Sequence, residues 1–384
     1  MVRPQGEWNA GAKSHRLLHC DQARKLKFGA SSGFHEELRR RVDEHFQRTR
    51  RRQRDCWPMY LKTAIFLGAF AAAYVLLVFV AQTWWLAAPL TVLLGLVAAG
   101  IGFNVQHDGG HHAYSDRSWI NQLMALTLDL LGGSSYIWAR KHNSIHHTYA
   151  NITGHDDDIN IGFFGRLSPH QPRWAFHRYQ HLYLWALYGL LPIKWQIWDD
   201  FRDVATGKIG THRFARPKGW DLVTFVIGKT VFFALALALP ILYHPVWVVL
   251  LCYAAASWVQ GVTLSVVFQL AHCVEEAAFP MPSQDNGRIG AAWALHQVET
   301  TVDFARGSRL LSWLIGGLNF QIEHHLFPRI CHVHYPALSR VVEQTCRDFG
   351  VRYAEHRTLG AALASHFRWL RRMGRPEAAA AQDS

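Results

Sequence analysis

The segment LAAPLTVLLGLVAAGIGFNV (residues 86–105) runs without a break into QHDGGHH (residues 106–112). An almost wholly apolar helix of this length can cross a hydrocarbon core of about 30 Å. Side chains four residues apart lie on one face of a helix, so the same helix would carry His107 and His111 out of the membrane together. The chain is therefore expected to be helical, to span a membrane and to present histidines where a span ends.

Three further segments are apolar over a similar length, at residues 61–82, 221–243 and 246–269. Only Thr83, Trp84 and Trp85 separate the first two spans, and the last two join near His244 and Pro245. Such short connections predict two helical hairpins, which makes four transmembrane helices. Lys229 lies inside the third span and, because an intramembrane lysine is costly, should face a neighbour or reach an interface.

The distribution of basic residues predicts the orientation of these spans. The two short turns contain no Lys or Arg, whereas the N-terminal segment, the loop at 107–219 and the C-terminal region are rich in both. By the positive-inside rule, both termini and the central loop should face the cytoplasm. Segments 118–138 and 178–198 of that loop are expected to be interfacial or re-entrant helices. A fifth or sixth span is the alternative, although an odd number would move one histidine cluster to the opposite face.

Histidines gather in three clusters, HDGGHH (107–112), HNSIHH (142–147) and QIEHH (321–325). A lone histidine is usually structural, but three doublets on one predicted face indicate metal ligation. Neutral imidazole is a common ligand of iron, copper and zinc. The eight histidines are enough to surround two metal ions, and they are His107, His111, His112, His142, His146, His147, His324 and His325.

Five stretches carry a family resemblance, namely QHDGGHH (106–112), KHNSIHHT (141–148), GHDDDI (154–159), HCVEE (272–276) and GGLNFQIEHHLFP (316–328). Over residues 58–355 the chain resembles the membrane fatty acid desaturases, and within them the front-end branch (Δ5/Δ6, linoleoyl-CoA desaturase-like). Gln321, in place of the first histidine of the third box, marks that branch. Many front-end members carry a cytochrome b5 domain with a His-Pro-Gly-Gly haem motif, which this sequence does not contain.

The resemblance implies an all-α integral membrane protein, with four transmembrane helices in two hairpins and a helical cytosolic cap holding a histidine-ligated di-iron site. The expected divisions are a basic cytosolic segment (1–57), the desaturase domain (58–355) and a C-terminal tail (356–384). The implied reaction inserts a cis double bond into a fatty acyl chain with O₂ and two electrons. Removing hydrogen from an unactivated chain requires a redox metal, which excludes zinc, and the resemblance implies two iron ions (Fe2+/Fe3+).

The resemblance adds His272 and Gln321 to the candidate ligands. His112 is either a ligand or a neighbour of the site, and His272 could instead be an interfacial histidine. Gln321 could bind a metal through its amide oxygen or a water, or could support a neighbouring ligand.

Acidic residues are expected to orient the ligand imidazoles, because metal-bound histidines usually donate their other N–H to a carboxylate or carbonyl. The candidates are Asp108, Asp156, Asp157, Asp158 and Glu323. A solvated turn is the alternative for the aspartate triplet, and His332 and His334 are interpreted as structural or supporting residues. Trp138, Tyr136 and Trp185 are candidate linings of an acyl tunnel, with a place in the core as the alternative for each.

The chain has no haem motif, no Gly-x-Gly-x-x-Gly turn and no Cys-x-x-Cys pair among its six cysteines. Electrons should therefore come from a separate carrier of the ferredoxin or cytochrome b5 type, with its reductase. The substrate would be a fatty acyl group, as a CoA thioester or linked to a membrane lipid. The net charge of +12, with eight arginines between Arg39 and Arg54, suits acidic partners or anionic lipid. Nucleic acid is disfavoured because four spans follow.

Three other functions would account for part of this sequence. A histidine-box hydroxylase, ketolase or alkane monooxygenase would share the metal chemistry, but the QIEHH box argues against it. A metal transporter would need polar residues inside its spans, which are nearly free of them here. An inactive scaffold is disfavoured by the complete second and third boxes.

Overall fold

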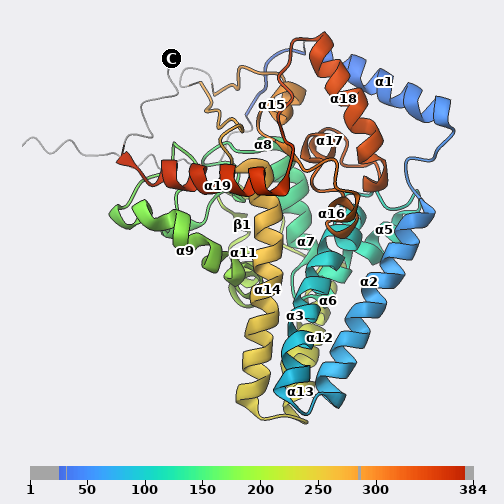
Figure 1. Cartoon of the computed structure of the whole chain (residues 1–384), viewed down its shortest axis with the longest axis vertical. Coiled ribbons are helices and arrows are strands. Elements are labelled where there is room, and N and C mark those ends of the chain that lie inside the picture. The colour runs from blue at the N-terminus through green and yellow to red at the C-terminus, as the bar shows by residue number, and fades with distance from the viewer. Residues whose placement is uncertain (1–25, 32, 284–286, 377–384) are drawn as a thin grey trace, which may run out of the picture.

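The computed structural model describes residues 26–31, 33–283 and 287–376. Helices make up most of the described chain and form a narrow stem beneath a broad cap (Figure 1). In the described part of the chain, strands occur only as β1 (Lys208–Ile209) paired antiparallel with β2 (His212–Arg213), and β3 (Asp303–Phe304) paired parallel with β4 (Glu355–His356). The expected helical fold class is confirmed.

Four helices in the described residues are long and apolar enough to cross a membrane, and they span Trp57–Val80, Trp84–Gly110, Trp220–Ile241 and Val246–His272. Their elements are α2 (Trp57–Val75) with η1 (Leu76–Val80); α3 (Trp84–Ile101) with η2 (Gly102–Gln106) and α4 (His107–Gly110); α12 (Trp220–Phe233) with η8 (Ala234–Ala238) and α13 (Leu239–Ile241); and α14 (Val246–His272). The number agrees with the sequence expectation, and no fifth such helix occurs in the described part of the chain.

The helices extend beyond the apolar segments that predicted them. The second apolar segment ends at residue 105 and its helix continues to Gly110, as expected for the helix that carries His107 out of the membrane. The fourth apolar segment ends at residue 269 and its helix continues to His272. Hydropathy stops at the first polar residues, whereas helical hydrogen bonding continues through them. Both extensions therefore carry histidines on a rigid, continuous helix.

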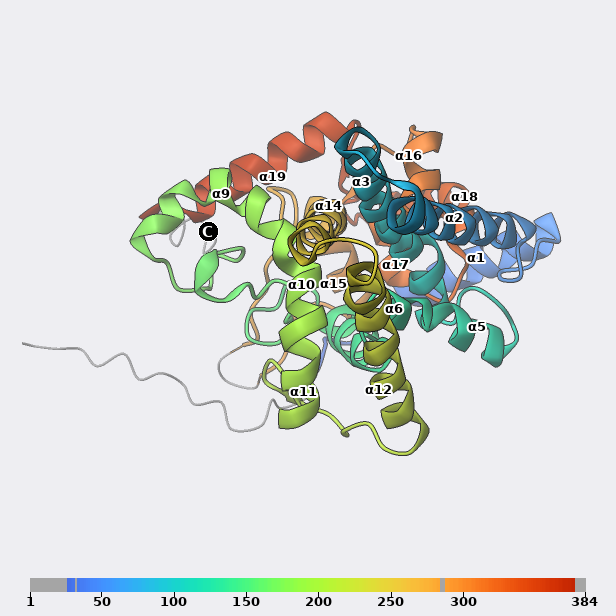
Figure 2. The same ribbon diagram turned by 90° about the horizontal axis from the view of Figure 1, so that it is seen from below.

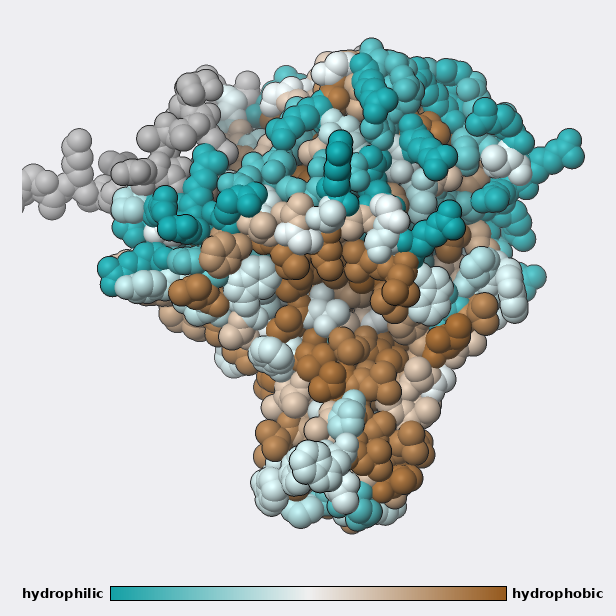
Figure 3. All heavy atoms as spheres, in the orientation of Figure 1, coloured by the Kyte–Doolittle hydropathy of each residue, from teal (hydrophilic) through white to brown (hydrophobic). Residues whose placement is uncertain are grey.

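The surface of the stem is apolar. Hydrophobic residues gather on the stem and hydrophilic ones on the cap (Figure 3). Large apolar side chains are exposed there, including Trp85 (91 %), Leu242 (76 %) and Ile227 (56 %). A soluble protein rarely exposes so much contiguous apolar surface, so a lipid environment accounts for this face.

The cap is made of shorter elements. Before the third span they are α1 (Phe34–Thr49), α5 (Ser118–Ala125), α6 (Thr127–Leu130), α7 (Ser135–Trp138), η3 (Ala139–His146), α8 (His147–Tyr149), η4 (Gly162–Phe164), η5 (Ala175–Tyr179), α9 (Gln180–Leu187), η6 (Tyr188–Leu190), α10 (Leu191–Lys194), η7 (Trp195–Asp199) and α11 (Asp200–Thr206). After the fourth span they are α15 (Trp293–Glu299), α16 (Arg309–Leu314), α17 (Gln321–Leu326), η9 (His332–His334), α18 (Tyr335–Asp348) and α19 (Leu359–Met373).

The segments expected to be interfacial are divided into short helices that project beyond the stem (Figure 2). Residues 118–138 contain the exposed Trp119 (61 %), and residues 178–198 contain the exposed Trp198 (63 %). Exposed tryptophan beside the stem is typical of a membrane–water boundary.

Lys229 in α12 is buried and has definite partners. Its Nζ lies 2.8 Å from Asp200 Oδ2 and donates to the carbonyl oxygens of Gly132 (2.7 Å) and Trp195 (3.1 Å). The expectation that it faces a neighbour is confirmed, and the ion pair joins α12 to the segment η7–α11.

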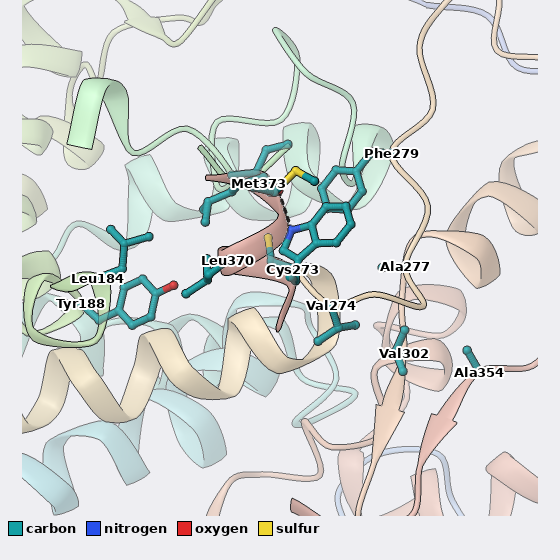
Figure 4. Packing of buried hydrophobic residues seen from close by; sticks show 13 residues of the cluster. Leu184, Tyr188, Cys273, Val274, Ala277, Phe279, Val302, Ala354, Leu370 and Met373 are labelled. Carbon is teal, nitrogen blue, oxygen red and sulfur yellow. Dashed lines mark hydrogen bonds between the residues drawn. The ribbon is translucent and has the colours of Figure 1, made fainter. Parts of the chain in front are cut away.

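The segment expected to be a tail from residue 356 contains helix α19, which packs on the cap. Leu370 and Met373 lie beside Cys273 and Phe279 (Figure 4), and the buried Trp369 donates its indole N–H to the carbonyl oxygen of Leu167 at 2.8 Å. Residues 356–376 are therefore part of the packed cap up to the end of the described chain.

Candidate metal centre

Three helical segments position the histidines of the first two boxes and His272. The second span continues through α4, so His107 and His111 leave the stem on a rigid helix. His142 and His146 of the second box lie on η3, an eight-residue π-helical stretch that widens the turn between them, and His147 begins α8. π-Helical turns occur frequently at functional sites, where they redirect side chains. His272 is the last residue of α14.

A close backbone contact brings the third box to the first. Gly316 has φ +63°, and a Cβ at this position would lie 2.2 Å from the carbonyl oxygen of Phe103 in η2. Only glycine permits this approach and this backbone conformation. The stretch GGLNF therefore lets α17 carry His324 and His325 onto the end of the second span.

The ligand nitrogens converge in adjoining groups, and within each group they lie within 4.8 Å of one another. One group contains His107, His111, His142 and His324. A second contains His146, His272 and His325, and a third links His147 to His324 and His325. Nine of the ten predicted ligands are thus placed at one site, counting Gln321, which is 4 % exposed and borders the same cavity as His324.

Four of these imidazoles are oriented through Nδ1. His146 Nδ1 lies 3.0 Å from Asp156 Oδ2, and His325 Nδ1 lies 2.8 Å from Gln297 Oε1. His272 Nδ1 donates to the carbonyl oxygen of Thr300 (3.2 Å), and His324 Nδ1 lies 3.2 Å from the Tyr335 hydroxyl.

The opposite nitrogens fit a metal. Nε2 of His111, His146, His272, His324 and His325 is buried and has no hydrogen-bond partner in the described chain. A buried polar atom without a partner is costly, and metal ions bound by the separate histidine groups would satisfy all five. In metal-bound histidines one ring nitrogen usually makes a hydrogen bond that orients the ring, and the other nitrogen is free to bind the metal. The residues present therefore fit a metal centre.

Burial also keeps the imidazoles in the form that binds metal. Burial and the neighbouring histidines lower the pKa of His111, His147, His324 and His325 well below the ordinary value. Burial lowers the pKa of His146 as well, but Asp156 more than compensates and raises it. Neutral imidazole is the ligand form, so four of these five side chains need release no proton on binding a metal.

The aspartate triplet lies against the second box and is not a solvated turn. Asp156 is 2 % exposed, and Asp158 Oδ2 lies 3.7 Å from His142 Nδ1. Burial opposes ionisation of Asp158, but Lys141, His142 and His146 together lower its pKa below the ordinary value. Lys141 Nζ lies 3.2 Å from a carboxylate oxygen of Asp157 and 3.2 Å from one of Asp158, and these two ion pairs hold the carboxylates beside the second box.

The structure places two of the expected supporting acids elsewhere. Asp108 Oδ2 accepts from the backbone N–H and Nδ1 of His332 (3.2 and 3.1 Å). Glu323 accepts from the Tyr353 hydroxyl at 3.0 Å. Each is adjacent in sequence to a box histidine, and consecutive helical residues point about 100° apart, so neither faces the ligands.

His112 also lies apart from the site. Its side chain is exposed, and its φ of +57° turns the chain away at the end of α4. It belongs to none of the groups of converging nitrogens among the described residues. The sequence could not separate His111 from His112, because the separation depends on this one backbone angle.

An apolar cavity of about 540 Å³ reaches the histidines. His107, His142, Gln321 and His324 border it, together with Trp138, whose ring stacks on His142 at 4.6 Å between centroids. Of the three aromatic residues proposed as linings, Trp138 alone borders this cavity. Tyr136 and Trp185 instead pack in core clusters.

Three supporting residues were missed by the sequence analysis, namely Gln297, Thr300 and Tyr335. They lie far from the boxes in sequence and belong to no motif. Gln297 is on α15 and Tyr335 begins α18, and both helices pack on α17. Only this packing reveals their contacts with histidines.

Four apolar helices, a buried histidine centre and an adjoining apolar cavity together define a membrane-bound histidine-box metalloprotein. The family model "Fatty acid desaturase" matches residues 82–357. The sn-1 linoleoyl-lipid 6-desaturase of Arthrospira platensis is 41% identical over 91% of this chain and 95% of its own length. The corresponding Synechocystis protein is 35% identical over 92% and 99%, and an acyl-lipid (8-3)-desaturase of Physcomitrium patens is 36% identical over 90% and 72%. The chain belongs to the fatty acid desaturase family, and the resemblance drawn from its motifs is confirmed.

Proposed function

We propose that this protein inserts a cis double bond into a lipid-linked fatty acyl chain, with front-end, Δ6-type regiochemistry, using O₂ and two electrons. The observation that carries the proposal is the convergence of buried imidazoles beside an apolar cavity, with Nε2 atoms that have no hydrogen-bond partner in the described chain. The names of the Arthrospira and Synechocystis relatives support the acyl-lipid substrate and the Δ6 position.

Two iron ions are the proposed cofactor. His107, His111, His142 and His324, with Gln321 beside them, would hold one ion, and His146, His147, His272 and His325 the other. When bound, the irons would supply the activation of O₂ and the removal of hydrogen, which no side chain can perform.

The chain itself would position the acyl substrate and exclude water from the centre. The cavity would hold one carbon–carbon pair of the acyl chain against the centre, and its apolar walls would exclude water. Asp156, Gln297 and Tyr335 fix the imidazole planes, so the ligands need not reorganise when a metal binds.

We further propose that the centre and both termini face the cytoplasm, where an acidic carrier of the ferredoxin or cytochrome b5 type, with its reductase, delivers electrons. A groove between α1 and α18 is lined by Arg41, Arg48 and Arg340, with His45 and one acidic residue, Glu44. Tyr335, at the start of the same helix α18, contacts His324, so α18 connects the groove to the centre. Complementary charge would steer an acidic carrier to it.

Expression in a desaturase-deficient host tests the function. Cells supplied with linoleate should accumulate an 18-carbon acid with one new double bond toward the carboxyl end, located by mass spectrometry of derivatised fatty acids. The matched control is His146→Ala, which should accumulate in the membrane without forming product. A hydroxylated acid from the wild type would instead support the monooxygenase alternative.

A further inference from the structure

A second apolar cavity, of about 370 Å³, lies among the four spans. Its walls include Phe70 and Tyr74 of α2, Leu94 of α3 and Phe232 of α12. It borders none of the box histidines. Three residues line both this cavity and the one at the metal centre, namely Leu131, Gln196 and Gln260. These three form the wall between the two chambers.

Gln196 is the hydrogen-bonded member of that wall. It lies on the π-helical turn η7, is 2 % exposed, and donates from Nε2 to the carbonyl oxygen of Leu131 at 3.0 Å. Its Oε1 accepts from the Tyr253 hydroxyl of α14 at 2.7 Å. The side chain therefore bridges α14 and the loop that follows α6, across the boundary between the cavities.

The surrounding backbone holds this bridge in place. Lys229 donates to the carbonyl oxygen of Trp195, the first residue of the π-helical turn, at 3.1 Å, and to that of Gly132 in the loop after α6 at 2.7 Å. Gly132 has φ +86°, and a Cβ there would lie 2.8 Å from Gln196 Cγ. Lys229 also pairs with Asp200 of α11, so one buried ammonium connects η7, the loop after α6 and α11 around the wall.

We propose that Gln196, held by Tyr253, ends the acyl chamber and thereby sets the length of acyl chain accepted beyond the metal centre. This inference rests on the proposed desaturase function. Lys141 and Asn160, which line the first cavity but not the second, suit the ester end of the substrate. The second cavity is apolar and lies within the spans, so the methyl end points toward the wall.

The test compares the conversion of 18-carbon and 20-carbon polyunsaturated acids supplied together to the expressing host. Gln196→Ala joins the two cavities and should raise the ratio of 20-carbon to 18-carbon product by about tenfold or more, because two further methylenes find an apolar space. Gln196→Leu keeps the volume of the wall and should leave the ratio near that of the wild type. Cys252→Phe, which fills the second cavity alone, should reverse the effect in the Gln196→Ala background.

Tyr74→Phe is the matched control, because Tyr74 lines only the second cavity and donates to Leu235, not to the wall. An unchanged ratio in Gln196→Ala, or an equal shift in Tyr74→Phe, would overturn the proposal. If Gln196→Ala does not accumulate, Gln260→Ala trims the same wall from α14 and must shift the ratio in the same direction. A wild type that converts neither acid would refute the proposed function and not the role of the wall.

Discussion

At the scale of single residues, neighbouring histidines in one box have different roles. His146 is fully buried, with Nδ1 on Asp156 and Nε2 without a partner, whereas His112 is exposed. His146→Ala should reduce product more than about 100-fold, because it opens a coordination position and disturbs its neighbours. His112→Asn, which tolerates the positive φ, should retain near-normal activity. Both are measured as product per unit of membrane-inserted protein, and substantial activity in His146→Ala would remove it from the ligand set.

Gln321 occupies the place of a histidine in the wider family. It is buried at the cavity, on the helix that carries His324 and His325. We expect Gln321→Ala to reduce activity by about 10–100-fold, as loss of a ligand or of a residue that orients one does. Gln321→His should also fail, because imidazole is a stronger and differently shaped donor. Wild-type turnover in Gln321→Ala would show that the residue takes no part in the site.

Cys56, just before the first span, offers a test by pH. A hydrogen bond with Cys331 and a contact with His334, whose Nε2 lies 3.2 Å from Sγ, lower the pKa of Cys56 to about 5. Only the thiolate is alkylated, so the rate of iodoacetamide labelling should rise with pH through a midpoint near 5. His334→Ala should move that midpoint upward. A midpoint near the ordinary thiol value in the folded protein, followed by peptide mass spectrometry, would contradict the contact.

At the scale of elements, α19 stabilises the cap although it lies beyond the last box. Trp369 is 1 % exposed and stacks on Phe279 at 4.8 Å between ring centroids. Trp369→Ala should lower the free energy of unfolding by about 3–5 kcal/mol, because a large buried ring leaves a cavity. Thermal unfolding in detergent, compared with the exposed control Leu359→Ala, measures the loss. An equal, small effect of both changes would mean that α19 is peripheral.

Elements also differ in how far the sequence predicts them. The apolar segments predict the spans. The helical spacing of the histidines predicts that the first box continues a span and that Gln321 shares a helix face with His324 and His325. The partner of Lys229 does not follow, since Asp200 lies in another element that reaches it only after folding. The same holds for Gln297 and Tyr335, whose contacts with His325 and His324 depend on the packing of α15 and α18. Hydropathy alone ends the spans too early, because it cannot detect a helix that continues through polar residues, whereas the spacing of His107 and His111 did predict the extension of the second span.

At the scale of the whole molecule, the apolar stem, the cap and the centre depend on one another. The stem supplies His107, His111 and His272 at the ends of two spans, while the cap supplies the other histidines of the centre from η3, α8 and α17. The centre therefore joins stem and cap, and bound metal should stabilise the whole fold by mass action. Chelation should accordingly lower the unfolding temperature of the purified protein.

The final prediction concerns the number and kind of metal ions. Two adjoining sets of converging nitrogens should give about two metals per chain, iron rather than zinc, because O₂ chemistry requires a redox metal. Plasma mass spectrometry of protein purified without chelator measures the content. His107→Ala should reduce the occupancy of the first set and His272→Ala that of the second, whereas His112→Asn should leave both unchanged. One tightly bound zinc and no iron would refute the di-iron proposal, even if the protein were folded.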